Sequence, residues 1–184
     1  GNIHWWDPGA YFQHLNRRVD GIICVSQAVK ESFDRLPNFN KNKTLVAGKG
    51  HDPAWYAGIK PIDLEAEFDI PAERITIIVV ANARRMKGMD YLGTAIRRLP
   101  PELNLHFLFV GRGLGTPELE SDLADSYYGH QYTFAGFRTD VLRILSAADV
   151  SLLPSVKGEG LSKVLLESVF LGRPAIMADI DGNK

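Results

Sequence analysis

The sequence predicts an α/β fold with a doubly wound parallel sheet. Short apolar runs of strand length alternate along the chain with segments of helical periodicity, as they do in βαβ units. Several of the runs are apolar nearly throughout, which burial on both faces of a parallel sheet requires. No internal repeat or low-complexity tract suggests another architecture.

The first expected strand is residues 21–26, GIICVS, which are rich in β-branched residues. Residues 27–36 follow with the spacing of a helix. The polar stretch PNFNKNK, residues 37–43, then interrupts the pattern, because it opens with a proline and is rich in asparagine and lysine. We therefore expect a boundary between residues 1–43 and residues 44–184.

The second part continues the alternation. Strands are expected at 44–49, 75–83, 105–111, 132–136, 149–155 and 174–179. Helices are expected between the later strands, at 89–99, 117–128, 140–148 and 162–172. Ligands of such sheets bind beyond the carboxyl ends of the strands, so the loops at that edge are the first places to look for a site.

Composition excludes several classes of protein. The chain has 184 residues, of which 45% are hydrophobic and 23% charged, as in a soluble globular protein, and its net charge of -1 gives no reason to expect nucleic acid as a partner. Cys24 is the only cysteine, which excludes an intramolecular disulfide and suits a reducing compartment. No apolar run approaches the roughly 18 to 20 residues that span a bilayer, and no signal-peptide pattern opens the chain. We therefore expect a cytoplasmic protein.

Charged or glycine-rich loops follow three of the expected strands. ARRMKG supplies Arg84 and Lys87 after the strand at 75–83. GRGLG begins at Gly111, and SVKGEGL follows the strand at 149–155. Because the carboxyl ends of parallel strands meet at one edge, we expect these cations and glycine turns to converge.

Other interpretations of the short motifs fit less well. GRGLGT has Thr116 where the dinucleotide fingerprint needs glycine or alanine, and its glycines are equally explained by a tight turn from strand to helix. AGKG lacks the earlier glycine of a Walker loop. The DID motif at 179–181 has the spacing of a metal–nucleotide site, but no cluster of carboxylates or histidines completes an oxygen cage nearby, so we predict no metal site.

Two carboxylates eight residues apart, Glu159 and Glu167, form a more informative pair. A sugar nucleotide presents hydroxyls at its sugar and at its ribose, and a carboxylate can accept hydrogen bonds from neighbouring hydroxyls. One acid at each end would therefore fix such a ligand. The diphosphate between them needs positive charge, which Arg84 and Lys87 can supply.

Backbone amides at the start of a helix favour a diphosphate as well, and Gly160, Leu161 and Ser162 are in the expected place. The alternative for Glu167 is a solvated helix face on which it pairs with Lys163, four residues earlier. The surrounding residues are largely apolar, which is typical of a buried helix, and an acid in such a helix is unfavourable unless it is paired or placed at a site.

These residues carry a resemblance to a known family. DVSLLPSVKGEGLSKVLLESVFLGRPAIMAD resembles the E-x7-E signature of retaining glycosyltransferases of the GT-B fold, the glycosyl transferases group 1 family. VVANARRMKGMDYLGTAI, LFVGRG, FAGF and VDGIICVSQAVKESF are similar to further motifs of that family, and all occur in the family's order over most of residues 19–182. The resemblance implies that residues 1–43 are a remnant of the N-terminal acceptor-side domain with its linker. It also implies that residues 44–184 are the C-terminal Rossmann-like domain that binds the nucleotide sugar, cut short at its end.

The resemblance also implies roles for single residues. Glu159 would contact the donor sugar and Glu167 the ribose, while Arg84 and Lys87 would hold the diphosphate, with Gly111 among the donor-binding residues. The family's arginine five residues before the lysine is replaced here by Asn82, so Arg84 is chosen over Arg85. Phe137 stands where the family contacts the base, although a core aromatic would fit that position equally well.

The activity implied is transfer of a sugar from a UDP- or GDP-sugar to an acceptor hydroxyl with retention, in glycan or cell-envelope polysaccharide synthesis. No metal or other cofactor is required, and the acceptor is a glycan or a lipid-linked molecule. Peripheral attachment of the full-length protein to the inner face of the membrane is compatible with this activity. The chain starts without methionine and is expected to be a fragment that is inactive alone. A sugar-nucleotide epimerase and a nonenzymatic nucleotide-binding module remain alternatives.

Overall fold

A computed structural model describes residues 8–16 and 18–180 of the chain, so Asp181 of the DID motif lies outside the described residues. By their contacts the residues divide into two compact units. The first reaches His51 and also contains Lys157–Ser162, whereas the second contains Asp52–Val156 and Lys163–Ala178. By these contacts the first unit extends beyond residue 43 to His51, because the strand that follows residue 43 pairs within it. The division into an acceptor-side remnant at 1–43 and a donor-binding domain at 44–184 stays a prediction.

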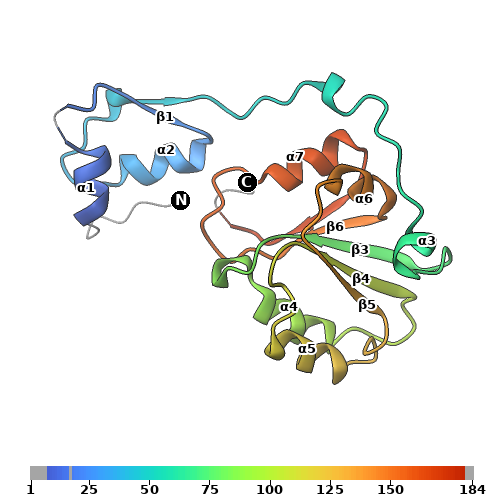
Figure 1. Cartoon of the computed structure of the whole chain (residues 1–184). Helices are drawn as coiled ribbons and strands as arrows, with labels where there is room; N and C mark the ends of the chain where they lie inside the picture. The colour runs from blue at the N-terminus through green and yellow to red at the C-terminus, as the bar shows by residue number, and fades with distance from the viewer. Residues whose placement is uncertain (1–7, 17, 181–184) are drawn as a thin grey trace. The chain divides into compact units, whose positions relative to one another are not determined.

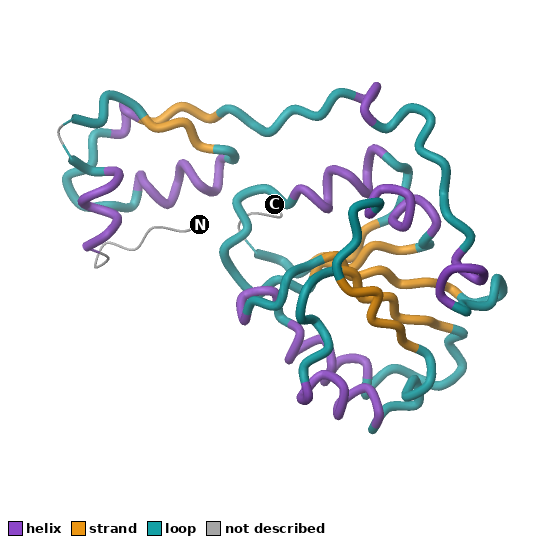
Figure 2. The backbone as a smooth tube through the Cα atoms, viewed as in Figure 1, coloured by secondary structure: helices purple, strands orange, loops and turns teal. Residues whose placement is uncertain are grey.

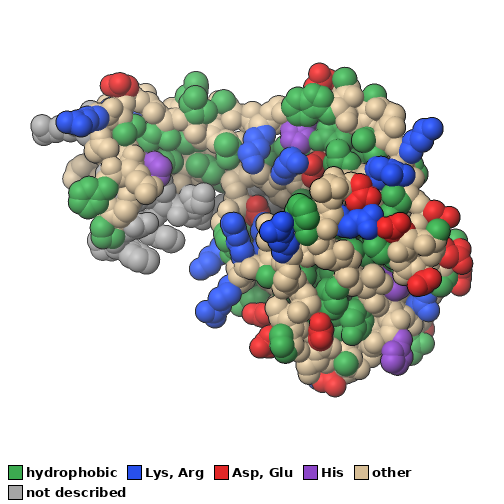
Figure 3. Space-filling model, viewed as in Figure 1, with side chains coloured by type: hydrophobic (Ala, Val, Ile, Leu, Met, Phe, Trp, Pro, Cys, Tyr) green, Lys and Arg blue, Asp and Glu red, His purple; other side chains and the backbone are tan. Residues whose placement is uncertain are grey.

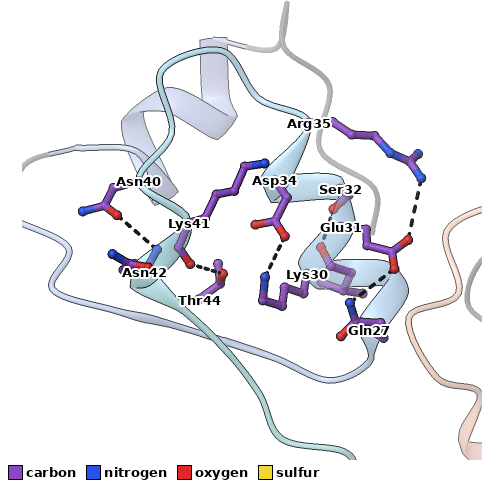
Figure 4. Close-up of polar contacts among 11 residues, drawn as sticks. Gln27, Lys30, Glu31, Ser32, Asp34, Arg35, Asn40, Lys41, Asn42 and Thr44 are labelled. Atoms are coloured by element: carbon purple, nitrogen blue, oxygen red, sulfur yellow. Dashed lines mark hydrogen bonds and ion pairs between the residues drawn. The ribbon is translucent and has the colours of Figure 1, made fainter.

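The first unit is built around a short parallel pair of strands. Its elements are α1 (Pro8–His14), β1 (Ile22–Cys24), α2 (Gln27–Asp34) and β2 (Thr44–Val46). Strand β1 pairs with β2, and Cys24, Phe33 and Leu36 form the buried core beneath them. Figure 4 shows the polar contacts that frame α2, among them the ion pair of 2.6 Å between Lys30 and Asp34.

The second unit holds the main sheet. Its strands are β3 (Ile75–Val80), β4 (Leu105–Val110), β5 (Tyr132–Gly136), β6 (Val150–Leu153) and β7 (Ala175–Met177). They form a parallel sheet in the order β5-β4-β3-β6-β7. The first strand of the unit, β3, is therefore central. The chain adds β4 and β5 on one side of it and then β6 and β7 on the other.

Helices cover both faces of this sheet. They are α3 (Leu64–Phe68), α4 (Met89–Ile96), α5 (Pro117–Ala124), α6 (Val141–Ala147) and α7 (Lys163–Phe170). Figures 1 and 2 show α4 and α5 on one face and α6 and α7 on the other, which two separate apolar clusters confirm. Every residue of β4 is buried, as expected of a central strand covered on both sides. The predicted doubly wound parallel sheet is confirmed.

The surface and the helix lengths agree with the composition. On the face drawn in Figure 3, acidic and basic side chains both cover the second unit, as a near-neutral net charge would suggest. Among the helices that the structure describes, none combines the length and the apolar character needed to cross a bilayer. Two helices, α1 and α3, were not expected from the sequence.

Candidate functional site

A cavity of about 250 Å³ lies in the second unit beyond the carboxyl ends of β3, β4 and β5. Its walls are formed by Val80, Ala81, Asn82, Lys87, Val110, Gly111, Phe137, Arg138, Val141 and Val164. Three residues predicted from the sequence, Lys87, Gly111 and Phe137, therefore meet at one cavity. Val164 comes from α7, which follows β6, so the cavity draws on both halves of the strand order. That is the place where open α/β sheets bind ligands.

Lys87 reaches the cavity because the loop after β3 is packed against the loop after β6. The loop forms a short 3-10 turn, Arg85–Lys87, and ends at Gly88 in a left-handed conformation with φ of 72°. The backbone N–H of Val156 donates a hydrogen bond of 2.9 Å to the carbonyl of Met86. Arg84 stands at the start of the turn, exposed, and does not line the cavity.

Gly111 lets three strands approach one another closely. Its φ is 146°, and a Cβ on it would lie 1.6 Å from the carbonyl oxygen of Ala81. Its N–H donates a hydrogen bond of 2.8 Å to the carbonyl of Gly136. Glycine is thus required at 111 by the close approach of the neighbouring backbones, and the same closeness leaves its backbone on the cavity wall.

The ring of Phe137 is 58% exposed, which excludes the core alternative for this residue. Cζ of Arg112 lies 4.4 Å from the centroid of that ring, within the range of a cation–π contact. Arg112 was not singled out from the sequence, because its place in a glycine turn gave no sign of an aromatic partner. Together the two side chains form an exposed surface at the carboxyl end of β5.

Arg138 also lines the cavity, but its guanidinium is engaged elsewhere. It donates two hydrogen bonds of 2.8 Å to Asp140 and one of 2.6 Å to Glu67, and it stands over the ring of Phe68. The hydrogen bond from Arg138 is the main reason that the pKa of Asp140 is lowered. Two carboxylates therefore compensate Arg138, and Lys87 is the other cation among the described residues that line the cavity.

Glu167 is 6% exposed on α7 and forms an ion pair of 2.7 Å with Lys163, whose side chain is 71% exposed. The hydrogen bond to Glu167 raises the pKa of Lys163. The alternative of a pair with Lys163 is therefore correct as to the partner, whereas the solvated face is wrong, because the carboxylate is buried. Glu167 does not line the cavity, although Val164 of the same helix does.

Glu159, Gly160, Leu161 and Ser162 belong to the first unit by their contacts. Nζ of Lys49 donates a hydrogen bond of 3.4 Å to the carbonyl of Leu161, and a Cβ on Gly160 would lie 2.9 Å from the side chain of Val25. Because α7 begins at Lys163, the residues at 160–162 precede the helix and do not form its first turn. Their roles toward a donor, and that of Glu159, stay predictions.

A larger cavity, of about 510 Å³, lies on the opposite side of the second unit. Arg74, Asp149 and Arg173, which precede β3, β6 and β7, are among its lining residues, so it marks the amino edge of the sheet. Ligands of this fold class bind at the carboxyl edge. The smaller cavity is therefore the candidate site.

A cavity beyond the carboxyl ends of a doubly wound parallel sheet defines the class of ligand-binding α/β proteins. Comparison with known families identifies the family within this class. Residues 74–184 match the family described as glycosyl transferases group 1, and the chain belongs to this family.

Similar proteins agree with this family. An uncharacterized glycosyltransferase of Methanocaldococcus jannaschii is 24% identical over 176 residues, which are 90% of this chain and 42% of that protein. An alpha-1,3-galactosyltransferase of Escherichia coli that uses UDP-Gal and GlcNAc-diphosphoundecaprenol is 37% identical over 82 residues, 42% of this chain and 20% of its own length.

Among solved structures, Anabaena HepE in complex with UDP-glucose matches with a TM-score of 0.77 and 23% identity, over 91% of this chain and 47% of HepE. That likeness confirms the fold. The chain spans less than half the length of the curated relatives it matches first.

Proposed function

We propose that this chain is the donor-binding part of a retaining glycosyltransferase that transfers a sugar from a nucleoside diphosphate sugar to an acceptor hydroxyl. The observation that carries the proposal is that Lys87, Gly111 and Phe137 meet at one cavity at the carboxyl edge of the sheet. Because the chain belongs to the glycosyl transferases group 1 family, we infer that the transferred group is a sugar.

Each residue has a role in the proposal. Lys87 meets the diphosphate and stabilises the negative charge that develops as it leaves, which is electrostatic catalysis by a pre-positioned cation. Arg84 adds charge from the same loop. The ring of Phe137 supports the base, since an exposed aromatic offers a flat apolar face. Glu167 accepts hydrogen bonds from the ribose, and Glu159 from the donor sugar.

The donor is a UDP-sugar or a GDP-sugar. The crystal structure of HepE in complex with UDP-glucose supports UDP as the nucleotide. The acceptor is a glycan or a lipid-linked molecule in the synthesis of a glycan or a cell-envelope polysaccharide, as the diphosphoundecaprenol substrate of the E. coli relative suggests. No metal is required in this proposal, because Lys87 and Arg84 offset the charge of the diphosphate. The full-length protein works in the cytoplasm or at the inner face of the membrane.

Replacement of Lys87 by alanine tests the donor site. We expect the affinity for UDP or GDP, measured by calorimetry, to fall roughly 10- to 100-fold, because a charge-assisted contact with phosphate is lost. Lys60→Ala removes an exposed lysine of the same unit that does not line the cavity and is expected to leave the affinity unchanged. Unchanged affinity of Lys87→Ala for every nucleotide tested would contradict the proposal.

Retention and transfer are tested on the full-length protein. Incubation with donor and acceptor should release nucleoside diphosphate only when the acceptor is present, and NMR of the product should show the anomeric configuration of the donor. An inverted product would refute retention alone, whereas nucleotide release that ignores the acceptor would refute transfer.

A further inference from the structure

Tyr56 packs on the helix that carries Glu167. Its ring stacks on Phe170 with the centroids 5.1 Å apart and 9° between the ring planes, and Tyr56 is 9% exposed. Phe170 follows Glu167 by three residues on α7. Residues three apart lie on neighbouring positions of one helix surface, so the aromatic stack and the buried carboxylate share a side of α7.

Tyr56 also lies within the electrostatic field of the Lys163–Glu167 ion pair. Burial is the main cause that raises the pKa of Tyr56, and the negative charge of Glu167 raises it further, while Lys163 lowers it. Tyr56 in turn contributes to the raised pKa of Lys163, after the larger effect of Glu167. The charges of Glu167 and Lys163 therefore both act on the phenol of Tyr56, which packs against Phe170 of α7.

Lys163 by itself is a weak restraint on Glu167. Its side chain is 71% exposed, and an exposed lysine exchanges its partner readily with water. Tyr56 and Phe170 are bulky rings with few rotatable bonds, and their contact is held between a buried residue and α7. The stack is thus the more rigid connection to the turn of α7 that presents the carboxylate.

We propose that Tyr56 is a positioning residue that holds Glu167 of the donor site in place through its stack on Phe170. The inference rests on the proposed function, in which Glu167 accepts hydrogen bonds from the ribose hydroxyls. It adds that discrimination for ribose depends on a residue from the segment that precedes α3. In this proposal Tyr56 acts through Phe170 and Glu167 and not on the sugar or the reacting atoms.

The test compares the affinities of the chain for UDP and for 2′,3′-dideoxy-UDP by calorimetry, with the GDP pair used if the chain selects guanine. We expect the wild-type protein to prefer the ribonucleotide roughly tenfold or more, and Glu167→Gln to lose most of that preference. Tyr56→Leu should lower the preference by about threefold or more, whereas Tyr56→Phe keeps the stack and should retain it. A purely structural role would weaken both nucleotides equally and leave their ratio unchanged.

Two further variants serve as a replacement and as a control. Phe170→Leu removes the same stack from the other side and replaces Tyr56→Leu if that variant fails to fold. Tyr127→Ala removes a 63% exposed tyrosine remote from α7 in the strand order and should leave the ratio as in the wild type.

The outcomes separate the two proposals. If Glu167→Gln loses the ribose preference while Tyr56→Leu and Phe170→Leu keep it, the positioning role is refuted and the proposed donor site stands. If the wild type shows no preference, or Glu167→Gln keeps it, the ribose role of Glu167 is refuted and the inference about Tyr56 falls with it.

Discussion

A Cβ atom on Gly88 would lie 2.1 Å from the carbonyl oxygen of Pro154. Gly88 ends the basic loop after β3, and Pro154 begins the loop after β6. No side chain fits that distance, so the contact between the two loops requires glycine at position 88. This close approach sets where Lys87 stands relative to the cavity.

Replacement of Gly88 by alanine should therefore damage both stability and the site. The variant combines a left-handed backbone with a steric clash, so we expect the free energy of unfolding to fall by about 2 kcal/mol or more. Displacement of the loop should also weaken nucleotide binding. Urea unfolding and calorimetry measure the two effects.

Gly58→Ala is the matched control for this variant. Gly58 has φ of 79° but no neighbouring atom within 4 Å of an added Cβ, so its replacement tests the backbone strain alone. We expect a smaller loss, about 1 kcal/mol, and unchanged nucleotide affinity. Equal losses for the two variants would show that the loop after β6 yields to the added methyl group.

Tyr128 should contribute to stability through its hydroxyl. The side chain is fully buried, and the carbonyl oxygens of Pro100 and Leu103, 2.7 Å and 3.0 Å from the phenol oxygen, share its one hydroxyl proton. Tyr128→Phe removes the buried donor from these two carbonyls, so we expect a loss of about 1 kcal/mol in urea unfolding. Tyr127→Phe, at the neighbouring exposed position, should change stability by less than about 0.5 kcal/mol. Similar values for both variants would argue against the hydroxyl contacts.

The sequence predicted the sheet because buried parallel strands need apolar runs, and the runs at β3, β4 and β6 are long enough to recognise. It did not predict α3, a five-residue helix whose start depends on the side chain of Asp63 accepting hydrogen bonds from Glu65 and Ala66. A helix of that length has too few residues to show a periodicity.

The candidate site was predicted in part for similar reasons. The basic loop and the glycine turn are local motifs, so Lys87 and Gly111 could be found from the sequence alone. The link from Arg138 to Glu67 and the stack of Tyr56 on Phe170 join residues far apart in the chain. No local sequence pattern predicts such pairs, because their members come into contact only when the sheet has formed.

His106 should make the second unit sensitive to acid. It is 6% exposed on β4, and burial, followed by the charge of Arg74, lowers its pKa from 6.5 to about 4. The unfolded chain therefore binds a proton that the folded chain does not, at every pH between these two values. The free energy of unfolding then decreases as the pH falls through this window, by an amount on the order of 1 to 3 kcal/mol in total.

The expected loss begins as the pH falls through the unfolded pKa of 6.5 and is complete below the folded pKa of about 4. Urea unfolding at a series of pH values from 7 to 4 measures it, and His106→Gln is the comparison, because glutamine does not titrate and can still pair with Thr133, 2.9 Å from the ring nitrogen of His106. Carboxylates contribute to both slopes equally, so the difference between the slopes reports on His106. Identical slopes for the two proteins would mean that the buried imidazole takes up its proton in the folded state as readily as in the unfolded chain.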